Sequence, residues 1–146
     1  MGYHAANAYT LPIGWNTQDG AGSIQTLYFG LSFSRNPNTG FANRKFQIPK
    51  GGVITRVSLF MFPTVAQVGA ETATLYVRNI DTSTDYVVDN AILFTTALGT
   101  TVFNKTLSIP VANDAANLVM KLVLPAYGGT IPTGILAWGT LYIESE

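Results

Sequence analysis

The side chains that could perform acid–base or nucleophilic chemistry are few and scattered along this sequence. His4 is the single histidine and lies near the N-terminus. A hydrolytic triad needs a base within hydrogen-bond reach of its nucleophile and a third group that orients the base. The stretch Gly30-Leu31-Ser32-Phe33-Ser34 resembles a nucleophile elbow, but it lacks the closing glycine and falls within a predicted strand. We therefore expect no serine hydrolase chemistry.

The acidic residues give no clearer indication of an active site. A glycosidase needs two carboxyl groups that converge at about 5–10 Å, and no spacing here signals or forbids such a pair. Asp81, Asp85 and Asp89 recur along one segment, and hard cations favour several oxygen ligands on a curved loop. Because the run lacks the central glycine of a calcium loop and contains Tyr86-Val87-Val88, which predicts a strand, we expect a solvated hairpin. The sequence predicts no enzyme, no metal site and no cofactor.

Composition excludes further classes of function. The 146 residues include no cysteine, which rules out disulfide scaffolds, thiol catalysis and cysteine-based zinc sites. Eight basic residues balance eight acidic ones, whereas a nucleic-acid binder needs a clustered excess of Lys and Arg and electrostatic docking to a membrane needs a polybasic segment. The apolar runs are far shorter than a membrane-spanning helix requires. We expect neither a nucleic-acid partner nor a membrane partner.

The low charge of the chain predicts association. Charged residues make up 11% of the sequence, against roughly 25% in a typical soluble domain, and hydrophobic residues make up 47%. Zero net charge with so few ionised groups favours contact between molecules over dispersal in water. We expect part of the surface to be buried in a permanent oligomer or against a larger body.

From Ser23 onward the sequence predicts short strands joined by Gly, Pro and Asn turns. Most of these segments alternate apolar and polar residues with a period of two, which indicates one buried face, and the others are short apolar runs. The predicted strands are at about 27–33, 42–48, 53–62, 72–78, 86–88, 92–95, 100–109, 118–124 and 135–143. Eight or nine short strands at spacings near ten residues predict an all-β fold, a jelly-roll-like antiparallel β-sandwich. In 53–62, Val53, Thr55, Val57, Leu59 and Met61 should share one face. Both faces become apolar toward the end of that strand, which we expect to be buried on both sides.

The first 22 residues differ from the rest. They are rich in Gly, Ala and Asn, contain Pro12 and show no sustained period. We expect residues 1–22 to form an extended N-terminal arm and residues 23–146 to form the sandwich domain. The arm carries the aromatic residues Tyr3, Tyr9 and Trp15, so it is either a loosely packed terminus or an arm that docks on a neighbouring chain.

Aromatic residues make up 12% of the chain. Sugar-binding sandwiches expose aromatic faces, but aromatic side chains also dominate cores and subunit interfaces, and we favour packing. Tyr76, Trp138 and Tyr142 lie opposite the predicted core stripes, so we expect them to face a second buried layer or a neighbouring subunit. The candidate interface residues are Tyr3, Tyr9, Trp15, Tyr76, Trp138 and Tyr142.

Three segments resemble strands of virion-surface sandwiches of tailed bacteriophages. They are Phe46-Gln47-Ile48-Pro49-Lys50-Gly51-Gly52-Val53-Ile54, Ala73-Thr74-Leu75-Tyr76-Val77-Arg78 and Gly139-Thr140-Leu141-Tyr142-Ile143-Glu144. The first is similar to an "IPKAG"-like strand end, with Gly51 where alanine is common, and the last is similar to a closing strand. The resemblance covers about residues 40–146 and leaves the first 22 residues unexplained.

The resemblance implies a jelly-roll-like domain, commonly a homotrimer, exposed on a phage particle. A fibre component usually needs a shaft, and the residues before the first predicted strand show no coiled-coil, collagen-like or β-helical repeat. We therefore expect a capsid decoration (cement) protein that binds the major capsid protein and stabilises the shell. The alternative is the receptor- or glycan-binding head of a tail fibre. Both place the chain in the virion, on the capsid surface or on the tail.

Overall fold

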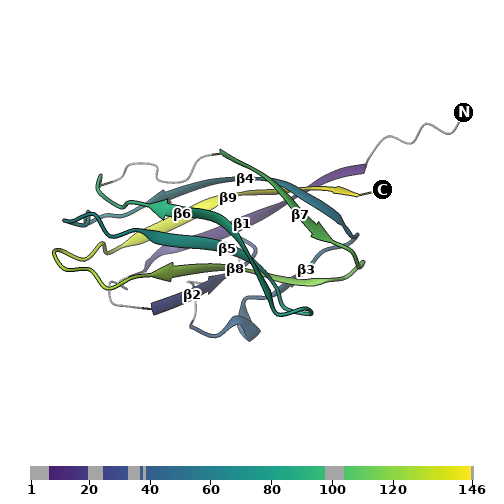
Figure 1. The fold of residues 1–146 in the computed structure, drawn as a ribbon, viewed down its shortest axis with the longest axis horizontal. Coiled ribbons are helices and arrows are strands. Elements are labelled where there is room, and N and C mark those ends of the chain that lie inside the picture. The colour runs from purple at the N-terminus through teal and green to yellow at the C-terminus, as the bar shows by residue number, and fades with distance from the viewer. Residues whose placement is uncertain (1–6, 20–24, 33–36, 38, 98–103, 146) are drawn as a thin grey trace, which may run out of the picture.

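The computed structural model describes residues 7–19, 25–32, 37, 39–97 and 104–145. Within them the chain forms two antiparallel β-sheets that pack face to face (Figure 1). The strands are β1 (Asn7–Asp19), β2 (Gln25–Phe29), β3 (Phe46–Gln47), β4 (Gly52–Phe62), β5 (Ala73–Asn79), β6 (Thr84–Ile92), β7 (Asn104–Val111), β8 (Asn117–Leu124) and β9 (Ile135–Ser145). The predicted all-β sandwich is confirmed.

The strand order is that of a jelly roll. The first sheet runs β1-β9-β4-β7 and the second runs β2-β8-β5-β6, with the short β3 also paired to β8. The chain changes sheet at every connection except between β2 and β3 and in the β5–β6 hairpin. Eight main strands alternating between two sheets in this way are typical of the double-sheet jelly roll.

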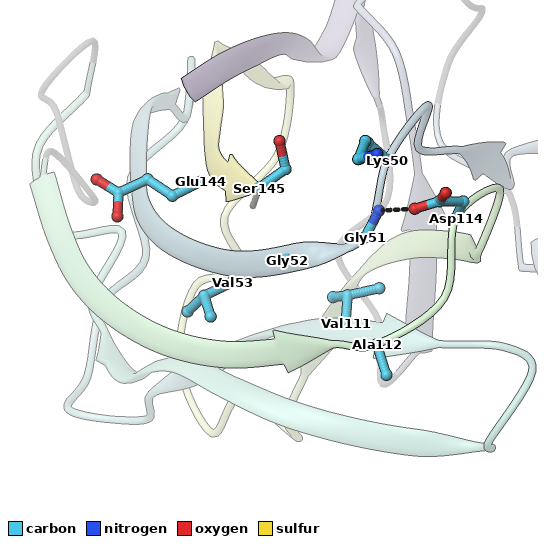
Figure 2. A pocket seen from close by; sticks show the side chains of 9 residues that line it. All are labelled: Lys50, Gly51, Gly52, Val53, Val111, Ala112, Asp114, Glu144 and Ser145. Atoms are coloured by element: carbon cyan, nitrogen blue, oxygen red, sulfur yellow. Dashed lines mark hydrogen bonds between the residues drawn. The ribbon is translucent and has the colours of Figure 1, made fainter. Parts of the chain in front are cut away.

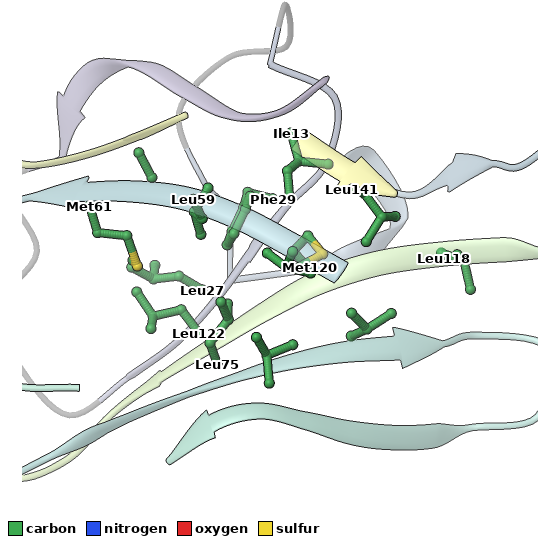
Figure 3. Close-up of a cluster of buried hydrophobic side chains, with 14 of the residues drawn as sticks. Ile13, Leu27, Phe29, Leu59, Met61, Leu75, Leu118, Met120, Leu122 and Leu141 are labelled. Atoms are coloured by element: carbon green, nitrogen blue, oxygen red, sulfur yellow. The ribbon is translucent and has the colours of Figure 1, made fainter. Parts of the chain in front are cut away.

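The core lies between the two sheets and is filled from both inner faces. Because successive side chains in a strand point to opposite sides, every second residue of the central strands is directed into this layer, and most of these residues are fully buried. Figure 3 shows the middle of the layer, where the labelled side chains are Ile13, Leu27, Phe29, Leu59, Met61, Leu75, Leu118, Met120, Leu122 and Leu141.

Residues 7–19, expected to belong to an arm, instead form β1 at the edge of the first sheet. β1 pairs with β9 along most of its length, and its outer edge also contacts the segment after β2 through the hydrogen bond from the Ser32 N–H to the Pro12 carbonyl oxygen, 3.0 Å. Pro12 is compatible with this position because an edge strand does not need every N–H for its ladder. The sandwich therefore includes at least residues 7–19 of the segment expected to lie outside it.

Trp15 is part of the core, in contrast to its expected role at an interface. Its side chain is fully buried, and its ring packs edge-to-face against Phe29 with 5.0 Å between centroids. The indole Nε1–H donates a hydrogen bond of 2.7 Å to the carbonyl oxygen of Ile135. Buried indoles usually need such a partner, so Trp15 fastens β1 to the beginning of β9.

A β-bulge changes the face pattern of β4. The register of β4 with both neighbours shifts between Ile54 and Arg56. Ile54 is fully buried, whereas Val53 is 36% exposed, so the expected core stripe through Val53 and Thr55 does not extend below Val57. Bulges re-aim the side chains around them, and this one brings Arg56 into register with Tyr142 of β9.

Other strand boundaries also differ from expectation. β6 is one continuous strand and not two short ones, and β7 continues through Pro110 because it is an edge strand paired only with β4. The segment 42–48, expected to be a strand, contains the 3-10 turn η1 (Phe41–Asn43) followed by β3. In the described part of the chain no helix has the length and apolar character needed to cross a bilayer.

Candidate interaction surface

Three aromatic side chains gather on the outer face of the first sheet. Trp138 of β9 is paired with Phe60 of β4, and Phe62 lies two residues further along β4. The Trp138 ring centroid lies 5.2 Å from that of Phe62 and 6.2 Å from that of Phe60, and the two phenylalanine rings are parallel at 6.1 Å. Trp138 is 51% exposed. We refer to Phe60, Phe62 and Trp138 as the aromatic cluster.

The neighbouring strand places a glycine beside this cluster. Gly14 of β1 is paired with Trp138 and therefore offers no side chain to cover the indole. Its φ is +135°, and a Cβ at this position would lie 2.2 Å from the carbonyl oxygen of Ala137, so only glycine fits here. Gly14 itself is buried, and the local backbone admits no larger side chain beside the exposed tryptophan.

A shallow hollow of about 470 Å³ lies farther along the same face. Six of the residues that line it are Tyr9, Thr10, Arg56, Thr106, Tyr142 and Glu144. The Arg56 guanidinium lies over the Tyr142 ring, 3.9 Å from its centroid, a cation–π contact that holds the charge at the edge of the hollow. We refer to it as the Arg56 hollow. Tyr142 lies four positions after Trp138 on β9, which places the cluster and the hollow about 13 Å apart.

The outer face of the second sheet has a different character. Asp85 accepts hydrogen bonds from Arg78 at 2.8 Å and from Lys121 at 2.7 Å. Partial burial alone would raise the pKa of Asp85, but these two hydrogen bonds outweigh burial and hold the pKa below its usual value. Lys121 also lies over the Tyr76 ring, 5.3 Å from its centroid, and Phe41 covers part of this face. The ion pairs of this face form within one chain.

The structure separates the six candidate interface residues. Trp138 and Tyr142 lie on the outer face of the first sheet, whereas Tyr76 lies on the opposite face of the sandwich. Tyr9 packs against the edge of the core and its hydroxyl donates to the carbonyl oxygen of Lys50; partial burial raises its pKa. Trp15 is in the core, and Tyr3 lies outside the described residues.

Three members of the surface were missing from the sequence-based set, namely Phe60, Phe62 and Arg56. Phe60 and Phe62 could have been found from the sequence, because both faces of the segment 53–62 become apolar toward its end, and that end was expected to be buried on both sides. In a single chain Phe60 and Phe62 are only partly buried. Arg56 gave no signal, because its contact with Tyr142 depends on strand pairing and on the bulge.

The acidic residues considered for chemistry serve the structure. Asp81 accepts hydrogen bonds from the backbone and side chain of Asn117, which lower its pKa. Asp89 is paired with Lys105 at 3.2 Å. Together with Asp85 they lie on or next to the β5–β6 hairpin, and their contacts point to different neighbours. The hairpin was expected to be solvated, but the Asp89 side chain is only 10% exposed. Among the described residues, no group of three or more His, Cys, Asp or Glu side chains could hold a metal ion.

A second pocket, of about 480 Å³, lies at the end of the sandwich where β4 begins and β7 and β9 end (Figure 2). Asp114 uses one carboxylate oxygen to accept the Gly51 N–H at 2.7 Å. The Ser145 hydroxyl donates to the carbonyl oxygen of Asn7 at 2.9 Å. Figure 2 shows Asp114 and Glu144 on opposite sides of the pocket, so these carboxylates do not converge as a glycosidase pair would.

Comparison with known proteins gives limited information. No protein-family model matches the chain, and no curated protein matches it. Among solved structures, the chain is similar to one titled "Structure of infectious bursal disease virus Gx strain", with a TM-score of 0.46 and 15% sequence identity. The match covers 94% of this chain and 30% of that one, so this chain spans less than a third of its length.

Proposed function

We propose that this chain is a structural protein of a virus particle: a capsid decoration protein of a tailed bacteriophage that binds the capsid surface as a homotrimer and stabilises the shell. The observation that carries the proposal is the aromatic cluster on the first sheet of a jelly roll, in which the Trp138 side chain is half exposed. Patches of this kind on soluble domains mark interaction sites, and aromatic side chains dominate the energetics of interfaces.

The strand order supports the proposal at the level of architecture. Double-sheet jelly rolls recur in viral capsid domains, lectins and cupins. One fold can host unrelated functions. The order β1-β9-β4-β7 and β2-β8-β5-β6 is therefore compatible with a viral structural role but does not by itself identify the function. The resemblance of 46–54, 73–78 and 139–144 to strands of phage virion-surface sandwiches favours the viral member of this group.

The distribution of charge gives separate support. In the described parts of β1, β9, β4 and β7, two charged side chains, Arg56 and Glu144, lie on the outer face of the first sheet. The second sheet and its hairpin carry Arg78, Asp85 and Lys121 in one network. A sheet face with so few ionised groups is better suited to contact with protein than to contact with water.

The location of the protein on the particle tests this proposal. Virions should be labelled with an antibody raised against the isolated chain and viewed by electron microscopy. A decoration protein gives label over the whole shell, and particles that lack the protein lose infectivity faster on heating than complete particles. Absence of the chain from purified virions, or equal heat resistance of the two kinds of particle, contradicts the proposal.

A receptor- or glycan-binding fibre head is the second candidate, favoured by the position of the loops. Asn7 is paired with Ser145, and the loops between β4 and β5 and between β8 and β9 lie at the opposite end of the sandwich (Figure 1). These loops expose Val65, Val68 and Ile131 by 48%, 63% and 37%. This function predicts label at the tail alone, together with saturable binding of the isolated chain to host cells.

A further inference from the structure

From the two features on the first sheet we infer how copies of this chain contact one another: the aromatic cluster of one copy seats in the Arg56 hollow of another. This inference rests on the proposed function and identifies the surface through which the subunits assemble. The partner that covers this face is a second copy of this chain.

The cluster has the composition of an interface centre. It is formed by three aromatic side chains without a charged group, and half of the Trp138 surface is exposed. Interface hot spots are enriched in tryptophan and lie in apolar surroundings from which water is excluded. The outer side of the β4 end, which the sequence pattern indicates should be buried, is the side that a second copy would cover.

The hollow offers a cation on which an aromatic ring of the cluster can stack. The Arg56 guanidinium has one face on the Tyr142 ring, and Arg56 is exposed, so an incoming indole can stack on its other face and complete a cation–π sandwich. Thr10 and Thr106 supply an uncharged rim. The Glu144 carboxylate also lines the hollow and is exposed, so the contact must leave it in water while the indole covers Arg56.

One face carries both partners of the contact, as association of identical copies requires. In a closed pair, each copy places its cluster in the hollow of the other, so two equal contacts form. In a closed ring of three, each copy gives its cluster to one neighbour and receives that of the other. Both arrangements use the same residue contacts.

The available area is sufficient for a specific contact. The face is about 19 Å wide, because it consists of four strands spaced by about 4.8 Å, and about 30 Å long, which is the length of the outward row of β9 residues. Its area is therefore roughly 570 Å². In a closed pair, two such faces bury about 1,100 Å², which is near the lower limit for specific protein–protein interfaces. The opposite face is a weaker candidate, because its charges are paired within the chain and Phe41 covers part of it.

Sedimentation velocity of the full chain and two matched variants tests the inference. Trp138→Ser removes the aromatic cluster's central ring, and Val87→Ser removes an equally exposed apolar side chain from the other sheet, since both residues are 51% exposed. Trp138→Ser should weaken self-association at least tenfold, whereas Val87→Ser should leave it unchanged. Far-UV circular dichroism checks that both variants remain folded, and Trp138→Phe should restore part of the association.

A photo-crosslinker locates the contact directly. Benzoylphenylalanine in place of Phe62 retains an aromatic ring, and after irradiation the cross-linked peptides are identified by mass spectrometry. Cross-links to residues 9–10, 104–107 or 142–144 of a second copy support the inference. Cross-links to other segments, cross-links only to capsid subunits, a monomeric wild-type chain, or a Trp138→Ser variant that associates normally each overturn it. A monomeric wild-type chain would also contradict the homotrimer in the proposed function. The other results leave the location of the protein on virions unchanged, so the decoration role is tested separately.

Discussion

Replacing Trp15 with alanine is the sharpest test of the assignment of 7–19 to the sandwich. Truncating a fully buried tryptophan costs about 3–5 kcal/mol. The Ile135 carbonyl oxygen also loses the 2.7 Å hydrogen bond from the indole, and an unsatisfied buried acceptor costs about 1–3 kcal/mol. The terms are not strictly additive, so we expect a loss of at least about 4 kcal/mol of a total stability of about 5–15 kcal/mol.

Urea unfolding followed by far-UV circular dichroism measures this loss. With a slope of about 2 kcal/mol per M, the midpoint should fall by about 2 M. Trp15→Phe keeps part of the ring and should lose about 1–3 kcal/mol. Trp138→Ala is the matched control, and at a protein concentration where copies are dissociated it should change stability by less than about 1 kcal/mol. An unchanged midpoint for Trp15→Ala would show that β1 is dispensable and would refute its place in the core.

Three further predictions follow from local contacts. The free energy of unfolding should fall with acidification below about pH 4. The pKa of Asp85 is lower in the folded chain than its ordinary value, so the ionised carboxylate stabilises the fold above that ordinary value, and this contribution is lost as the carboxylate protonates. In urea titrations at several pH values, Asp85→Asn should flatten this part of the profile. Burial, aided by the negative charge of Glu71, raises the pKa of Tyr127 to about 12. A titration followed by phenolate absorbance should therefore show one tyrosine that ionises last. Tyr127→Phe should remove that step without loss of stability, because the buried hydroxyl has no hydrogen-bond partner among the described residues. Gly14→Ala should lower the thermal midpoint by several degrees, because its φ of +135° and the Ala137 carbonyl oxygen leave no room for a Cβ; an unchanged midpoint would contradict the described backbone.

The sequence pattern predicted those strands in which one face is buried. Alternation placed 118–124 and 135–143 almost where β8 and β9 lie, because a residue in a central strand must be either inward or outward. Edge strands follow weaker rules. Pro110 was expected to end its strand and Pro12 to argue against one, yet both lie in edge strands that tolerate proline.

The candidate surface was harder to predict than the fold. Trp138 and Tyr142 were identified because they alternate with core residues, and alternation is a local property. Trp15 was misassigned because its burial depends on pairing with a strand more than 100 residues away. The contact of Arg56 with Tyr142 depends on a bulge and on register, which no short window of sequence reveals.

The position of β9 has a consequence for how the chain folds. The last strand lies between β1 and β4, and the ladder of β1 is formed with it. During synthesis, therefore, β1 leaves the ribosome long before β9, the strand with which it forms its ladder. Topologies dominated by such distant pairings fold slowly, and an unpaired strand is prone to aggregation. The nascent chain should thus be exposed to aggregation through β1 until β9 has emerged.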